Sequence, residues 1–94
     1  MEQRFVAAWA KARSDAQKLG VRMRPVADGD ALTQAHRILS GHRESDGFFQ
    51  LVDLGKADLT LEALAVQKQF TGLFSDLEAN NALTRLLDAG YSFK

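Results

Sequence analysis

The sequence contains no cysteine and only one proline among its 94 residues. Without cysteine the chain has no disulfide, no thiolate metal site and no cysteine nucleophile. No segment approaches the ~20 consecutive apolar residues that a membrane-spanning helix needs. The first residues alternate charged with apolar side chains and lack the apolar stretch of a signal peptide. We therefore expect a cytoplasmic protein, with a composition common among small bacterial helical proteins.

Motifs that carry chemistry are also scarce. The glycines are scattered, close to one per predicted helix end, and form no phosphate-binding loop. His36 and His42 are six residues apart, which does not place them on one face of a helix. His42, Glu44 and Asp46 share one polar turn and offer nitrogen and oxygen ligands, although such turns are usually just solvated. Ser40 beside His42 has no assignable acidic partner. We expect no enzyme, no metal and no cofactor.

The remaining composition is that of a globular protein, with 46% hydrophobic and 26% charged residues. The length predicts a single domain, residues 1–94, with one modest core. The net charge is zero but unevenly spread. Residues 1–43 carry eight Lys and Arg against four Asp and Glu, and residues 44–94 carry the reverse. The two halves either complement each other, within one fold or in a dimer, or present a basic face to an acidic partner.

Apolar spacing predicts a first helix over about residues 2–19. A stripe with alternating gaps of four and three runs along one face of this segment and comprises Phe5, Trp9, Ala12, Ala16 and Leu19. Gly20 is the expected stop, with Val21 as the apolar residue beyond it. The loop that follows contains Pro25, which favours an extended conformation at Arg24, and the turn-forming residues 28–30.

A second helix is predicted over about residues 30–40, capped by Asp28 or Asp30 and ended by Gly41. Its inner face is expected to contain Ala31, Ala35 and Ile38, widened by Leu32 and Leu39. After a polar turn, Ser45 or Asp46 is expected to cap a short third helix over residues 48–54, closed by Gly55. The alternative for residues 48–62 is a β-hairpin that turns at Gly55 and Lys56, because Leu59, Leu61 and Ala63 alternate with polar residues.

The C-terminal third carries the strongest helical pattern. Asp58 and Thr60 are candidate caps for a fourth helix, whose stripe comprises Ala63, Val66, Phe70, Leu73 and Leu77. Gly72 predicts a break over residues 70–74. Ser75 and Glu78 read as a capping box for a fifth helix that runs to Ala89. Its expected inner face comprises Ala79, Ala82, Leu83, Leu86 and Leu87. Gly90 should end it, with Tyr91 folding back onto Leu86.

These elements predict an all-α fold, a compact bundle of four or five short helices with a C-terminal helical hairpin. With no catalytic group in sight, we expect a protein that acts through protein–protein interaction, as an inhibitor, an adaptor or a self-association module. The candidate partner-binding residues form two groups. The first is the aromatic cluster of Phe70, Leu73 and Phe74, because the core of a chain of this size can hardly enclose all its aromatic side chains. The second is the pair of loop arginines, Arg22 and Arg24. The alternative is that the aromatic cluster belongs to the core.

A second hypothesis is a regulator that binds nucleic acid through its basic N-terminal half. The candidate residues are Lys11, Lys18, Arg22, Arg24, Arg37 and Arg43. The last predicted helix does not support a recognition-helix role, since its outer charges are mostly acidic.

Overall fold

The computed structural model describes residues 2–23, 26 and 28–91, and the regular secondary structure of these residues is helical, with no β-strand. The five α-helices are α1 (Glu2–Lys18), α2 (Ala31–Ser40), α3 (Phe48–Asp53), α4 (Leu61–Ala65) and α5 (Asp76–Asp88). Three segments of 3₁₀-helix connect them, Asp28–Asp30, Ala57–Leu59 and Lys68–Leu73. The prediction of an all-α fold is confirmed, and the β-hairpin alternative for residues 48–62 is wrong.

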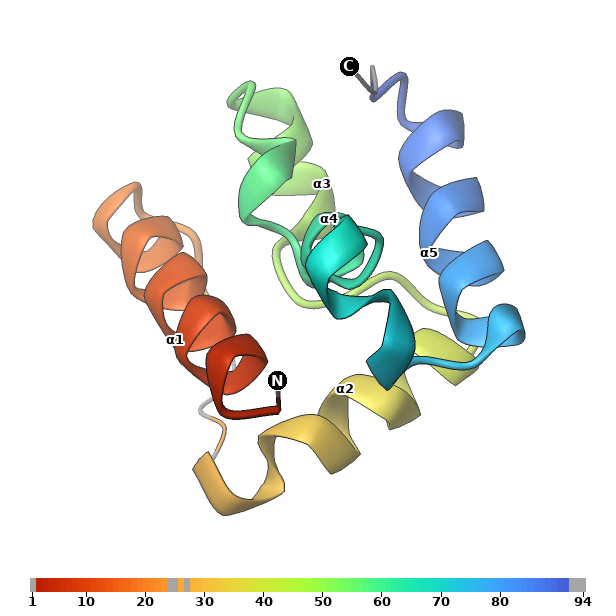
Figure 1. Ribbon diagram of the computed structural model, residues 1–94. Coiled ribbons are helices and arrows are strands. Elements are labelled where there is room, and N and C mark those ends of the chain that lie inside the picture. Colours follow the sequence, from red (N-terminus) through yellow and green to blue (C-terminus); the bar gives the residue numbers. More distant parts are fainter. Residues whose placement is uncertain (1, 24–25, 27, 92–94) are drawn as a thin grey trace.

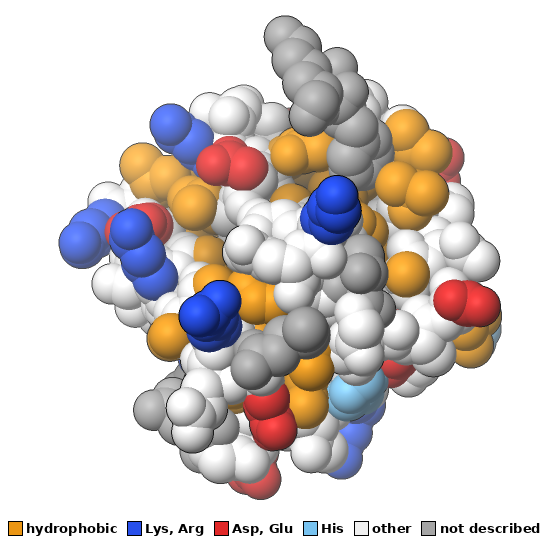
Figure 2. Space-filling view, viewed as in Figure 1, with side chains coloured by type: hydrophobic (Ala, Val, Ile, Leu, Met, Phe, Trp, Pro, Cys, Tyr) orange, Lys and Arg blue, Asp and Glu red, His pale blue; other side chains and the backbone are white. Residues whose placement is uncertain are grey.

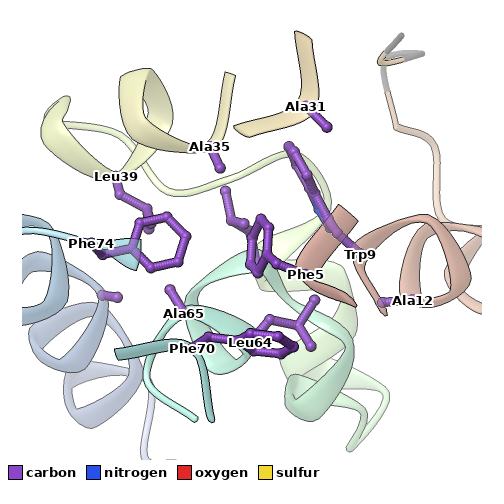
Figure 3. Close-up of a cluster of buried hydrophobic side chains, with 12 residues drawn as sticks. Phe5, Trp9, Ala12, Ala31, Ala35, Leu39, Leu64, Ala65, Phe70 and Phe74 are labelled. Carbon is purple, nitrogen blue, oxygen red and sulfur yellow. The ribbon is translucent and has the colours of Figure 1, made fainter. Parts of the chain in front are cut away.

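The helices surround one main core. α1 and α5 lie on opposite sides of the molecule with α3 and α4 between them, and α2 runs across one end (Figure 1). Phe5 and Trp9 of α1 point toward α2 and α4 (Figure 3). The ring of Phe5 meets Phe70 and Phe74 edge to face, with centroids 5.3 and 5.1 Å apart, a favoured geometry for aromatic pairs. No helix among the described residues is long and apolar enough to cross a membrane.

The ends of the helices follow local sequence signals. The Ser75 hydroxyl accepts from the Glu78 amide and the Glu78 carboxylate accepts from the Ser75 amide, so the predicted capping box is present. Thr60 caps α4 by accepting from the amide of Ala63. Three helices end in the paired hydrogen bonds of a Schellman motif around a left-handed glycine, at Gly20, Gly55 and Gly90. Tyr91 packs in the same cluster as Leu86, as expected.

The cap predicted for α3 is wrong, and the one predicted for α2 is matched in position at Asp30 but not in its hydrogen bond. Asp30 stands at the N-cap of α2, but its backbone is already helical and its side chain makes no capping hydrogen bond. The other candidate cap, the Asp28 side chain, lies outside the described residues. The N-cap of α3 is Gly47, not Ser45 or Asp46, with a left-handed φ of 75°. A Cβ at Gly47 would lie 2.5 Å from Val21 Cγ1, so both the backbone conformation and the close packing favour glycine here.

The fourth helix is shorter than predicted. It ends at Ala65, and Gln67 then takes an extended conformation before the 3₁₀-helix Lys68–Leu73. The chain becomes extended again at Phe74. The helix therefore breaks at residue 66, four residues before the break over residues 70–74 that Gly72 predicted. Its physical consequence is that Phe70 and Phe74 both turn inward onto Phe5.

The buried face of α5 differs most from the prediction. Ala82 and Leu86 are buried as expected, and Ala79 is half-buried. Leu83 and Leu87, predicted for the inner face, are 37% and 56% exposed, and Leu77 is 61% exposed. Glu78 and Arg85 are buried in their place. In α1 the predicted stripe is buried except for Leu19, which lies beyond the last helical residue and is exposed.

Candidate interaction surfaces

Arg85 and Glu62 form an ion pair inside the protein. Arg85 Nη1 lies 3.3 Å from Glu62 Oε2, and Glu62 is fully buried. Removing two charges from water costs several kcal/mol per ion unless every polar atom finds a partner. Arg85 also donates to the carbonyls of Ile38 and Gly41, and Glu62 accepts from the amide and hydroxyl of Ser45. The pair therefore fixes the turn that follows α2.

Asn81 of α5 completes this arrangement by donating to the carbonyl of Leu39 at 2.9 Å. The last carbonyls of a helix have no partner within the helix. Here the side chains of Arg85 and Asn81 donate hydrogen bonds to the last carbonyls of α2. One side of α5 is thus polar because it closes the end of another helix, and this explains why its leucines do not all face inward.

A second polar contact joins α2 to the start of α5. His36 Nδ1 lies 2.7 and 2.9 Å from the two carboxylate oxygens of Glu78. Because a carboxylate only accepts, Nδ1 carries the proton that is donated. Burial raises the pKa of Glu78, but the Ser75 amide and His36 lower it by more, so the pKa lies below its ordinary value of 4.5. His36 is therefore occupied in holding α2 to α5.

The predicted partner-binding aromatics lie in the core. Phe70 and Phe74 are buried against Phe5, and Leu73 is half-buried beside them. Phe70 and Phe74 offer no surface for docking in this conformation, so for these two the alternative that they belong to the core describes the structure. Arg22 is exposed and lines a shallow hollow of about 350 Å³ together with Met23, Asp46 and Gly47. Arg24 lies outside the described residues.

Four of the six cations proposed for nucleic-acid binding fall into two groups. Lys11 and Lys18 are exposed on α1, in line with Arg4. Arg37 and Arg43 instead line a cleft of about 660 Å³ at the end of α2, which His42, Glu44 and Asp46 also line. That cleft combines both signs of charge. Among the described residues, no three His, Asp or Glu side chains gather in a group that could hold a metal ion. Arg24, again, is outside the described residues.

The surface feature that the sequence did not reveal is the outer face of α5. Leu77, Asn80, Thr84 and Leu87 recur at gaps of three, four and three, and all are exposed. Leu83 lies on the flank of this line. Figure 2 shows hydrophobic side chains at the surface along α5 next to acidic groups, whereas on the side of α1 it shows Lys and Arg with acidic side chains among them. We call the five α5 residues the leucine face.

Comparison of the chain with protein-family models, with curated proteins and with solved structures finds no match.

Proposed function

We propose that this protein acts by binding another protein chain through the leucine face of α5, and that it is not an enzyme. The observation that carries the proposal is the exposure of Leu77 and Leu87, at 61% and 56%, on a helix that buries an arginine and a glutamate. Burying a leucine side chain fully is worth about 1.5–3 kcal/mol. A partner that covers this face would gain that energy, and the fold itself does not use it.

The geometry of the face suits a protein partner. Leucines at helical spacing are the anchors by which one helix packs against another helix or a groove. Asn80 and Thr84 lie between the leucines and can hydrogen-bond at the edge of such an interface. Two of the groups that could have done chemistry are engaged in the fold, since His36 contacts Glu78 and the Ser45 hydroxyl donates to Glu62. As compartment we propose the cytoplasm, which the sequence led us to expect.

Site-specific photo-crosslinking tests this proposal. A photoreactive residue replaces Thr84 in the leucine face, and in a matched control it replaces Thr33, an exposed threonine of α2. We expect covalent adducts with a defined protein chain, identified by mass spectrometry, from position 84 and not from position 33. Leu87→Gln should then weaken binding of the purified partner at least about tenfold. Equal adduct yields at the two positions, or none at position 84, would refute the proposal.

A second candidate function is nucleic-acid binding, which the line of cations on α1 favours. Arg4, Lys11 and Lys18 are exposed on one side of this helix. Three phosphate contacts predict that log K for duplex DNA falls with log[salt] at a slope of about −3. Replacing the three residues by glutamine should abolish that slope. If the wild-type chain does not bind duplex DNA even at low salt, this candidate is excluded.

A further inference from the structure

The outer face of α1 is basic and contains no large apolar residue. Arg4, Ala7, Lys11, Ser14 and Lys18 recur at gaps of three and four, all are exposed, and they lie opposite the buried stripe of α1. We call these five residues the basic face. None of its three cations makes an ion pair with another described residue. The uneven charge of the two halves is therefore not cancelled here by contacts within the fold.

The leucine face carries the opposite charge at its two ends. Asp76 and Asp88 are exposed at the first and last residues of α5, and neither makes an ion pair within the described part of the chain. The basic residue of this helix, Arg85, is buried in its pair with Glu62. The face therefore combines exposed leucines in its length with a carboxylate at each end.

The two faces match in length as well as in charge. An α-helix rises about 1.5 Å per residue, so Asp76 and Asp88 are roughly 18 Å apart along α5, and Arg4 and Lys18 are roughly 21 Å apart along α1. Laid side by side, each aspartate can approach a cation at one end. Ala7 and Ser14 are small residues between the cations of α1 and leave room there for leucine side chains. The stems of Lys11 and Lys18 add apolar surface of their own.

One molecule cannot bring its own two faces together, because α1 and α5 lie on opposite sides of the fold with α3 and α4 between them (Figure 1). A symmetric contact between two copies of α5 is disfavoured by charge. If the helices run antiparallel, Asp76 of one copy lies beside Asp88 of the other, and like charges in contact are unfavourable.

We propose that the partner of the leucine face is the basic face of a second copy of this chain. The inference rests on the proposed function, because it takes the leucine face as the docking surface, and it adds the identity of the partner. The contact is heterologous, so each complex keeps one leucine face and one basic face free and can add further copies as concentration rises. The end charges are exposed, so the association weakens with salt.

One double variant and one triple variant test the two faces separately. In the first, Leu77→Gln and Leu87→Gln alter the leucine face and leave the basic face intact. In the second, Arg4→Gln, Lys11→Gln and Lys18→Gln alter the basic face and leave the leucine face intact. Phe49→Gln on α3 is the matched control, since Phe49 is as exposed as Leu77, at 61%. Circular dichroism and urea unfolding establish that each variant is folded before its mass is measured.

Sedimentation equilibrium then measures the mass in solution. We expect the mass of the wild type and of Phe49→Gln to rise with concentration and to fall with added salt. Each face variant alone should remain a monomer, with self-association at least about tenfold weaker. An equimolar mixture of the two face variants retains one intact leucine face and one intact basic face per pair. It should form a heterodimer and grow no further.

Three results would overturn the inference. A wild-type chain that stays monomeric at all concentrations removes the second copy as partner, while the crosslinks from position 84 still decide the proposed function independently. Undiminished self-association of the basic-face variant alone would show a symmetric contact between leucine faces. Loss of association in Phe49→Gln would place the interface on another part of the surface.

Discussion

The first and last helices of this protein have similar apolar patterns but bury them differently. In α1 the buried residues are all apolar, and the charged residues are exposed or half-buried, with Arg13 lying over the ring of Trp9. In α5 the buried set includes Glu78 and Arg85, and Leu77 and Leu87 face outward. The difference arises because α1 has only a core to cover, whereas α5 also closes the end of α2 and fixes the turn after it. Burial follows the demands of the neighbouring elements as well as the helical period.

The largest effect is expected from Phe5→Ala in α1. Phe5 is fully buried and contacts Phe70 and Phe74 through its ring edges. Truncating a buried phenylalanine costs about 3–5 kcal/mol through lost burial and the cavity left behind. We expect a fall of this size in the free energy of unfolding, measured by urea titration. Lys11→Ala on the exposed side of the same helix is the control and should change it by less than about 0.5 kcal/mol. Similar losses for both would mean that α1 is not packed by its apolar stripe.

Arg85→Met in α5 tests the other half of the comparison. It leaves the Glu62 carboxylate buried without its cation, which costs about 3–5 kcal/mol. The double variant Arg85→Met with Glu62→Met removes both charges, and we expect it to be more stable than the Arg85→Met single variant. A double-mutant cycle from urea unfolding measures the coupling between the two positions. If the losses simply add, the pair does not act as a unit, and the contact with Glu62 does not explain why α5 buries Arg85.

The parts of α5 that could be read from the sequence are its two ends. Ser75 and Glu78 are three residues apart, and each side chain accepts a hydrogen bond from the backbone amide of the other. Gly90 ends the helix through hydrogen bonds to the turn just before it. Short sequence motifs therefore suffice to predict both ends. The partners of Arg85 lie 23 to 47 residues away in the chain. No local pattern specifies that kind of contact. Apolar spacing therefore placed Leu83 and Leu87 inside, where the carbonyls of α2 in fact required polar partners.

Contacts between distant parts of the chain also explain why the candidate aromatic site was predicted at the surface and lies in the core. The aromatic cluster of residues 70–74 looked too large for the core of a 94-residue chain, but the early end of α4 turns Phe70 and Phe74 onto Phe5. Nothing in the sequence marks that end, because neither Val66 nor Gln67 is a helix breaker. The exposed leucine face became visible only when the polar side of α5 was known. The uneven charge of the two halves was predictable. The exposed line of Arg4, Lys11 and Lys18 without ion pairs to other described residues was not.

Glu78→Gln sharpens the comparison by removing a buried charge at the first turn of α5. The neutral amide is a weaker partner for His36 and for the helix N-terminus, so we expect a loss of about 1 kcal/mol near pH 7. The pKa of Glu78 is lowered in the folded state, so its contribution is complete above the unfolded pKa. That contribution is lost as the pH falls below about 4.5 and through the folded pKa. Between about pH 6 and about pH 3 the free energy of unfolding should therefore fall more for the wild type than for Glu78→Gln. Parallel pH profiles of unfolding would show that the carboxylate carries no such linkage.

The smallest effect on folding is expected where the sequence pattern predicted a core position. Leu77→Gln combined with Leu87→Gln should change the free energy of unfolding by less than about 0.5 kcal/mol, because both side chains are more than half exposed. The measurement belongs at the lowest protein concentration that gives a signal, where self-association adds nothing to stability. Leu86→Gln, one residue away and fully buried, is the matched control and should be strongly destabilising. If the first pair destabilises the monomer as much as the control, then the two leucines serve the fold, and α5 has no surface left over for a partner.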